Sequence, residues 1–317
     1  MELKILVMGK QLTVIIPTYN RCQDVCKNVL FLDQCITNSG LSDDVKVIVS
    51  DNHSDDDTYK SLTELKKSIS NDFEFHTQLK NIGGTFNSRS VLKDVQTPYA
   101  MLLGDDDFLD KDYLRIVIDA INNDSDIAAI FPNFHSNLSN NCRDDIVEDK
   151  IYEAGTKALG LMFKAHQMSG LVFKTEGVLE TLFKKKGENR YYQVYCMGYN
   201  MLRGKTLHIT RNPMCVNDTN KKFWTYGNDG LWDDMLLNIR LLDLAEPERR
   251  RLERYYLLHY SWSVVPRFVK NPINFVKAIA GLKNMTTSTK WVVLPYMFMS
   301  CCLILYRKKI RKVGKVK

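Results

Sequence analysis

The chain contains eight cysteines but no Cys-x-x-Cys pair, and no pair of histidines lies near them. Cys22 and Cys26 could share a helix face, but two sulfurs without further ligands do not form a zinc site. Cysteines scattered in this way are typical of reduced thiols in a cytosolic protein. The sequence therefore predicts neither a zinc site nor a disulfide-stabilised secreted domain.

The features that send a protein into or across a membrane are also scarce. Residues 1–10 lack the longer apolar core and the cleavage site of a secretory signal. The largely apolar segment Trp291–Tyr306 has sixteen residues, which is short of the roughly 20 that span a bilayer, and it contains Pro295. We therefore expect a cytoplasmic protein that does not cross the membrane.

Positive charge is concentrated at the end of the chain. The last eleven residues, Arg307–Lys317, hold seven basic residues and no acidic one, which equals the formal net charge of +7. With the Trp and Tyr residues of 291–306, this tail is typical of a helix that dips into the surface of an anionic membrane. A buried core helix followed by a disordered tail is the alternative. No nucleic-acid partner is predicted, because the basic residues are not interleaved with aromatic ones.

Short buried strands alternate with helical segments in the first hundred residues. Leu12–Ile16 and Val45–Val49 are rich in β-branched residues, and the segments 23–36 and 58–69 that follow them have a helical pattern. This alternation predicts βαβ units and a parallel sheet. Ligands of such sheets bind beyond the carboxyl ends of the strands.

Three polar clusters follow predicted strands and should meet at that edge of the sheet. They are Pro17–Arg21, Asp51–Asp56 and Asp105–Asp107, the last after the apolar run Tyr99–Leu103. Consecutive carboxylates repel one another unless a cation neutralises them. Hard oxygen ligands suit Mg²⁺ or Mn²⁺, which one or two carboxylates typically hold together with substrate phosphates. A solvated acidic turn is the alternative, but the two neighbouring clusters favour a site.

Four motifs resemble those of the family 2 glycosyltransferases in order and spacing. They are Val14–Asn20, Val47–Ser54, Asn81–Gly84 and Gly104–Asp107, within residues 12–110. The resemblance implies the α/β fold called GT-A, which has a Rossmann-like, mainly parallel sheet with helices on both faces. It also implies an inverting transfer of a sugar from a nucleotide-diphosphate donor, assisted by Mg²⁺ or Mn²⁺.

By this resemblance, the loop after the first strand packs on the nucleoside, which implies that Pro17, Thr18, Tyr19 and Arg21 bind it. Asp51 matches the acidic residue that hydrogen-bonds the edge of the base. A planar base needs a stacking face and partners in its plane, and Tyr19 with Asp51 could provide both.

Asn81, Gly83 and Arg89 match the segment that precedes the acidic motif in the family. A basic side chain there would lie near the diphosphate of the donor. Arg89 could equally be a surface residue of a helix.

The acidic motif departs from the Asp-x-Asp-Asp of many relatives, because Gly104 stands at its first position. Two registers remain for the metal-binding pair: Asp105 with Asp107, or Asp106 as the direct ligand with Asp107 beside it. We expect Asp107 first and Asp106 second. Asp105 could replace the missing carboxylate as a partner of the ribose.

Asp233 and Asp234 open an amphipathic helix at 232–240. Carboxylates in the first turn favour the helix dipole, and that alone could explain them. The pair is also similar to the acidic pair, usually Glu-Asp, that holds the catalytic base in the family. This implies Asp234 as the base, with Asp233 or Asp229 as substitutes.

We expect residues 1–245 to form the catalytic domain, with a nucleotide and metal half at 11–110 and an acceptor half at 111–245. Residues 246–317 would form a helical, membrane-associating extension. The predicted reaction transfers a sugar to a glycan or lipid-linked acceptor at the inner face of the cell membrane, in the synthesis of a bacterial capsule or O-antigen.

A catalytically inactive nucleotide-sugar-binding protein on the same fold is the alternative. A sugar nucleotidyltransferase would need a glycine-rich phosphate loop after the first strand, which Pro17–Asn20 is not.

Overall fold

The structure is a computed structural model, and it describes residues 9–136, 148–184, 189–216, 231–260 and 280–313. The strands are β1 (Leu12–Thr18), β2 (Val45–Asp51), β3 (Asp72–Thr77), β4 (Tyr99–Leu102), β5 (Phe108–Leu109), β6 (Ile127–Ser136), β7 (Lys150–Tyr152), β8 (Leu171–Lys174) and β9 (Lys205–Val216). The α-helices are α1 (Cys22–Asn38), α2 (Thr58–Leu65), α3 (Gly84–Ser90), α4 (Tyr113–Asn123), α5 (Val178–Lys184), α6 (Tyr192–Met201), α7 (Leu231–Leu241), α8 (Glu246–Tyr260) and α11 (Thr287–Val313). Within these ranges the structure also contains two 3₁₀ helices, η1 (Val91–Asp94) and η2 (Leu159–His166).

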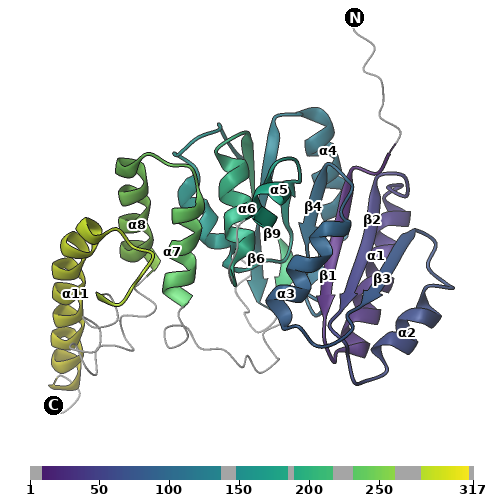
Figure 1. The fold of residues 1–317 in the computed structure, drawn as a ribbon, viewed down its shortest axis with the longest axis horizontal. Coiled ribbons are helices and arrows are strands. Elements are labelled where there is room, and N and C mark those ends of the chain that lie inside the picture. The colour runs from purple at the N-terminus through teal and green to yellow at the C-terminus, as the bar shows by residue number, and fades with distance from the viewer. Residues whose placement is uncertain (1–8, 137–147, 185–188, 217–230, 261–279, 314–317) are drawn as a thin grey trace, which may run out of the picture.

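One mixed sheet forms the centre of the described residues, with helices around it (Figure 1). Its strand order is β3-β2-β1-β4-β8-β6-β9-β5, and β7 also pairs with β9. The first four strands are parallel, as the βαβ pattern predicts. Beyond them β8 runs antiparallel to both β4 and β6, while β9 is parallel to β6. The predicted α/β class with a large central sheet is confirmed.

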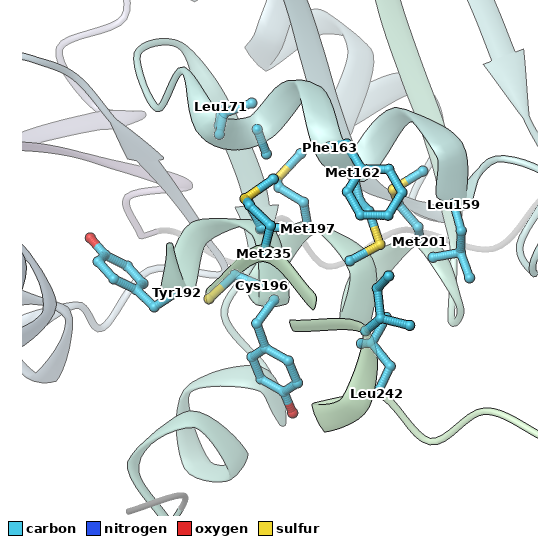
Figure 2. Packing of buried hydrophobic residues seen from close by; sticks show 14 of the residues in the cluster. Leu159, Met162, Phe163, Leu171, Tyr192, Cys196, Met197, Met201, Met235 and Leu242 are labelled. Carbon is cyan, nitrogen blue, oxygen red and sulfur yellow. The ribbon is translucent and has the colours of Figure 1, made fainter. Parts of the chain in front are cut away.

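Alternation along β1 separates the hydrophobic core into two layers. Leu12, Val14 and Ile16 belong to a buried cluster shared with α1 and α4, whereas Ile15 belongs to the cluster shared with η2 and α6. Successive side chains of a strand point to opposite faces, so both faces of the sheet are covered. Figure 2 shows the cluster that contains Ile15, in which methionines such as Met162 and Met197 fill the space between helices.

The C-terminal helices lie at the end of the molecule opposite β3 and α2 (Figure 1). Leu252 and Leu257 of α8 and Val293 of α11 are buried in the same hydrophobic cluster as Ile15. α8 and α11 therefore share a hydrophobic core with the rest of the described residues, and a domain boundary at residue 245 stays a prediction. None of the helices in the described ranges has the length and apolar character needed to cross a membrane.

The parallel strands set the position of the polar clusters. Thr18 at the end of β1 is paired with Asp51 at the end of β2, and Leu103 donates its backbone N–H to the carbonyl of Ile15. β8 starts at this same edge, because Leu171 is paired with Leu102 at the end of β4. The sheet thus brings segments far apart in the sequence to one edge.

Candidate active site

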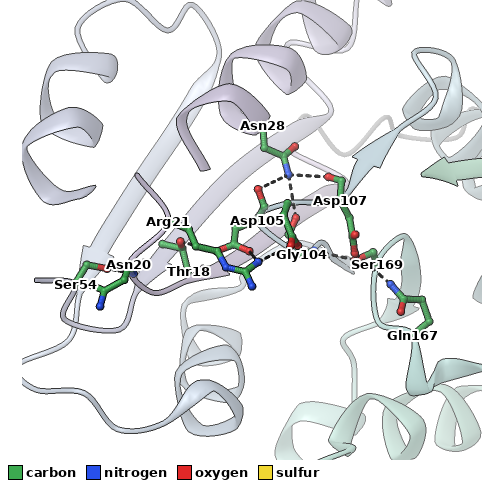
Figure 3. A network of polar contacts seen from close by, with 11 residues as sticks. Thr18, Asn20, Arg21, Asn28, Ser54, Gly104, Asp105, Asp107, Gln167 and Ser169 are labelled. Atoms are coloured by element: carbon green, nitrogen blue, oxygen red, sulfur yellow. Dashed lines mark hydrogen bonds and ion pairs between the residues drawn. The ribbon is translucent and has the colours of Figure 1, made fainter. Parts of the chain in front are cut away.

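The loop after β1 and the acidic motif after β4 meet through Arg21. Its Nη1 atom lies 2.9 Å from Oδ1 of Asp105 and 2.6 Å from Oδ2 of Asp106. Oγ1 of Thr18 donates a hydrogen bond of 2.7 Å to Oδ2 of Asp105 (Figure 3). Two of the three clusters predicted to meet at this edge are therefore in direct contact.

The charges in this contact are strongly coupled. Burial raises the pKa of Asp105 to about 6, against the opposing effects of Arg21 and Thr18. Burial also lowers the pKa of Arg21, but the two carboxylates outweigh it and leave that pKa raised. One guanidinium thus supplies the positive charge that a buried carboxylate, Asp105, and its partly buried neighbour Asp106 require.

Asp107 is held by residues from the second half of the chain. Its Oδ2 atom accepts hydrogen bonds from Oγ of Ser169 and, at 3.2 Å, from Nε2 of Gln167 (Figure 3). Asn28 of α1 fixes the backbone of the motif, because its Nδ2 atom donates to the carbonyls of Gly104 and Asp107, each at 2.9 Å. Asp107 is 6% exposed, so its carboxylate is part of the framework of the motif.

Close packing explains the glycine at the first position of the motif. A Cβ atom on Gly104 would lie 2.9 Å from Oδ2 of Asp107 and 3.2 Å from Oγ of Ser169. The backbone N–H of Gly104 donates to the same Ser169 hydroxyl at 2.9 Å. No side chain fits at position 104 unless Asp107 or Ser169 moves.

The loops after β1 and β2 are pinned together. The N–H of Asn20 donates to Oγ of Ser54, and Oδ1 of Asn20 accepts from the N–H of Asp55, both at 2.8 Å. Asp51 is fully buried, and its Oδ1 atom accepts from the N–H and the hydroxyl of Ser54. Tyr19 is 38% exposed, so its ring is open to solvent at this edge.

Pro17, the remaining nucleoside residue predicted from the sequence, lies within β1 opposite Ser50. It therefore belongs to the sheet, one residue before the polar edge begins at Thr18. Its ring fixes the backbone from which Thr18 and Tyr19 project.

The other residues predicted to bind the nucleotide-sugar donor, Asn81, Gly83 and Arg89, contact other parts of the protein. Oδ1 of Asn81 accepts from the N–H of Gly83 at 2.9 Å, and Gly83 precedes α3 with a φ of +86°. The guanidinium of Arg89 donates to the carbonyl of Leu182 at 2.6 Å and lies over the ring of Phe183. Arg89 thus contacts α5, whereas Arg21 is the cation at the acidic motif.

The acidic pair of α7 divides its contacts between two different partners. Oδ2 of Asp234 forms an ion pair of 2.7 Å with Nε of Arg190. Asp233 accepts hydrogen bonds from the backbone N–H of Asn284 at 2.8 Å and from its Nδ2 atom at 2.9 Å. Asp229 lies outside the residues that the structure describes.

A known family matches most of this architecture. The sequence model described as Glycosyl transferase family 2 matches residues 13–207, which is more than half of the chain. The chain belongs to glycosyltransferase family 2. The predicted resemblance is therefore confirmed. A search of curated proteins finds no match.

Solved structures of glycosyltransferases share the fold. TarS 1–349 of S. aureus in complex with UDP-GlcNAc is similar with a TM-score of 0.63 and 12% identity, over 84% of this chain and 81% of that chain. The same TarS fragment in complex with UDP is similar with a TM-score of 0.65 and 14% identity, over 97% of this chain and 92% of that chain. The mannosyltransferase PcManGT of Pyrobaculum calidifontis, in complex with GDP-Man and Mn²⁺, is similar with a TM-score of 0.52 and 14% identity, over 94% of this chain and 87% of that chain.

Three residues of this candidate site were not among those predicted from the sequence, namely Asn28, Gln167 and Arg190, and the contact of Ser169 with Asp107 was not predicted either. Ser169 contacts Asp107 across 62 positions of sequence. Local patterns cannot reveal such a pairing, because the topology of β4 and β8 creates it. Asn28, by contrast, is a polar residue on the buried face of α1, which is an unusual position that invites a search for partners.

Proposed function

We propose that the chain is an inverting glycosyltransferase that moves a sugar from a nucleotide-diphosphate donor to a glycan or lipid-linked acceptor. The observation that carries this proposal is the contact of Arg21 with Asp105 and Asp106 at the carboxyl edge of the sheet. A diphosphate, which is anionic, and a divalent cation can both bind where carboxylates and a guanidinium meet. Exposed Tyr19 next to this cluster is suited to stack on the base.

The residues present fit a Mg²⁺ or Mn²⁺ ion. Asp105 and Asp106 are adjacent carboxylates that already require a positive partner, and their oxygens are the ligands such ions prefer. No group of three or more His, Cys, Asp or Glu side chains in the described ranges is arranged to hold a metal. This agrees with a site completed by donor phosphates. When bound, the ion would neutralise charge on the leaving diphosphate.

Among the three carboxylates we assign the metal to Asp106 before Asp107. Asp106 contacts Arg21, a mobile type of side chain that can be displaced, and its own side chain is 14% exposed. Asp107 is turned toward Ser169 and Gln167. The order expected from the sequence, Asp107 first, is kept as the competing assignment.

Asp234 is proposed as the base that takes the proton from the acceptor hydroxyl as that hydroxyl attacks the anomeric carbon. Attack from the face opposite the leaving diphosphate inverts the configuration. Arg190 holds the Asp234 carboxylate in place by an ion pair of 2.7 Å. Asp233 is occupied by Asn284, so it supports the helix instead of serving as a second base.

The proposed role in the cell is the synthesis of a bacterial surface polysaccharide, capsule or O-antigen, by a peripheral protein at the inner face of the membrane. A lipid-linked acceptor would be available there. The competing function is nucleotide-sugar binding without transfer on the same fold. Both carboxylates of the pair are already engaged, Asp233 by Asn284 and Asp234 by Arg190, and this observation keeps the competitor relevant.

Thermal unfolding with a panel of nucleotides and sugar nucleotides, with and without Mn²⁺, tests the donor half of the proposal. A ligand that binds the native state at about 100 times its dissociation constant adds roughly 2.7 kcal/mol of stability. One base should stand out, and Mn²⁺ should increase its effect. Absence of any shift across the panel would reject the proposal. Transfer to a lipid-linked glycan distinguishes the enzyme from the binding protein.

A further inference from the structure

One face of α11 exposes large apolar side chains to solvent. Trp291 is 73% exposed, Tyr296 57% and Met299 55%. We name this surface the α11 contact face and define it by its members Trp291, Val292, Tyr296, Phe298, Met299 and Leu303. The stretch 291–306 contains no charged residue. A contiguous apolar surface of this kind on a soluble domain marks an interaction site.

The opposite face of the same helix is fixed to the protein. Val293 is 1% exposed and lies in the hydrophobic cluster shared with α8 and Ile15. α11 contains the segment 291–306, for which the sequence left a core helix and a membrane-surface helix as alternatives. The segment is both a core helix, through one face, and an open apolar surface, through the other.

Two carboxylates clamp the turn that leads into α11. Asp233 of α7 accepts a hydrogen bond from the N–H of Asn284. Thr286, two residues after Asn284, donates to the Glu253 carboxylate of α8 from its N–H at 3.1 Å and from its hydroxyl at 2.9 Å. Glu253 is 1% exposed, so its clamp is made in the interior. Charge-assisted hydrogen bonds of this kind are stronger than neutral ones. α11 is therefore tied to the first turn of α7, directly beside Asp234.

The charge distribution selects an anionic bilayer as the occupant of the contact face. α11 continues to Val313, and its last seven residues, 307–313, include five lysines and arginines. Two copies of the chain packed in parallel through this face would bring these like charges together. Anionic headgroups would neutralise them, while the aromatic and apolar side chains enter the interface.

We propose that the α11 contact face docks on an anionic bilayer and that the Asp233–Asn284 clamp transmits this docking to the catalytic helix α7. Asp233 is then a positioning residue that fixes α7 relative to the membrane surface. The consequence for catalysis rests on the proposed function: a lipid-linked acceptor would meet Asp234 at a defined height above the bilayer. Docking and clamping themselves do not depend on sugar transfer.

Flotation of the full chain with vesicles of phosphatidylcholine and phosphatidylglycerol tests the docking. The amount of the double variant Trp291→Ser/Phe298→Ser that floats with the vesicles should be at least about tenfold lower than for the wild type, because two large apolar side chains no longer enter the interface. A matched control is Tyr59→Ser/Leu79→Ser, which removes two exposed apolar side chains at the other end of the molecule and should float like the wild type. High salt should weaken flotation of the wild type.

Hydrogen exchange of α7 amides tests the transmission without any measurement of activity. Vesicles should slow exchange in 231–241 about threefold or more in the wild type, because docking stabilises the clamped helix against local opening. In Asp233→Ala the protein should still float, but the vesicles should no longer protect α7. Thermal unfolding confirms that each variant is folded.

Equal flotation of the contact-face variant and the wild type would overturn the docking, as would light scattering that shows a dimer formed through this face without vesicles. Unchanged α7 exchange on vesicle binding in the wild type would overturn the transmission. Both results are separate from failure of the proposed function, which would appear as the absence of nucleotide binding by a protein that still floats.

Discussion

Arg21 and Asp106 form an ion pair of 2.6 Å that joins the loop after β1 to the acidic motif after β4. The same guanidinium contacts Asp105, so a single cation holds two carboxylates side by side. A divalent ion would compete with Arg21 for these oxygens, and a donor diphosphate would compete with the carboxylates for Arg21. Binding of donor and metal together is thus an exchange of partners within one cluster.

The first prediction separates the two candidate metal ligands. Asp106→Asn should remove the gain in nucleotide affinity that Mn²⁺ provides, because it deletes an anionic oxygen while nearly conserving shape. Asp107→Asn should keep that gain but lower stability, since its carboxylate is hydrogen-bonded by Ser169 and Gln167. Calorimetric titration with nucleotide, with and without Mn²⁺, measures the gain. Loss of the gain only in Asp107→Asn would restore the order expected from the sequence.

The second prediction concerns Gly104. Gly104→Ala should destabilise the protein by about 1–3 kcal/mol, because the new methyl group would overlap Oδ2 of Asp107 and press on Oγ of Ser169. Urea unfolding measures the loss. Gly84→Ala is the control, since a Cβ atom there meets nothing within 4 Å and α3 begins at this residue. If both variants have the same stability, the packing argument is wrong.

The third prediction concerns the base. Asp234→Asn should reduce kcat by about 10²–10⁴-fold and leave donor affinity nearly unchanged, since the base contacts the acceptor and not the nucleotide. Steady-state kinetics with a defined acceptor, together with a donor titration, gives both quantities. A parallel fall in donor affinity would mean that Asp234 is structural. A larger loss of kcat in Asp233→Asn would move the base by one residue.

The fourth prediction is a pH dependence of stability due to His208. Its pKa is lowered from 6.5 to about 4, chiefly by burial and further by Lys164 and Lys150, while Asp149 opposes them. The unfolded chain therefore takes up the proton first, and the free energy of unfolding falls as the pH is lowered from 6.5 toward 4. Nε2 of the neutral ring lies 3.0 Å from Oδ1 of Asn133.

His208→Gln should reduce this acid-side decline by roughly 1–3 kcal/mol. Urea unfolding at several pH values between 4 and 7 measures it. His76→Gln is the control, because the His76 side chain is 46% exposed. A decline that is equally steep in His208→Gln and in the wild type would show that other groups cause it.

Local pattern was enough to predict the elements around the site. The β-branched run Leu12–Ile16 predicts β1, and the rule that parallel strands share a carboxyl edge predicts that Arg21 and Asp105 lie close together. Burial of Asp51 also has a local signal, since Ser54 three residues later can cap its carboxylate. The resemblance to the family did not reveal that this capping takes the carboxylate away from solvent.

Long-range packing was beyond the reach of the sequence. The direction of Arg89 depends on α5, which lies about ninety positions later and offers both a carbonyl and the ring of Phe183. The partner of Asp234 is Arg190, from a segment with no motif of its own. Such contacts are fixed by how the helices stack on the sheet, and periodicity does not specify that stacking.

The hydrogen bond from Ser169 to Asp107 limits how the protein can be divided or recombined. Residues 11–110 contain all three carboxylates of the motif, yet the hydroxyl that holds the last one belongs to residues 111–245. A chimaera joined at residue 110 would take Asp107 from one parent and its hydroxyl from the other. The two halves predicted from the sequence are therefore not independent modules, and we expect a successful exchange between relatives to need both residues of this bond from the same parent.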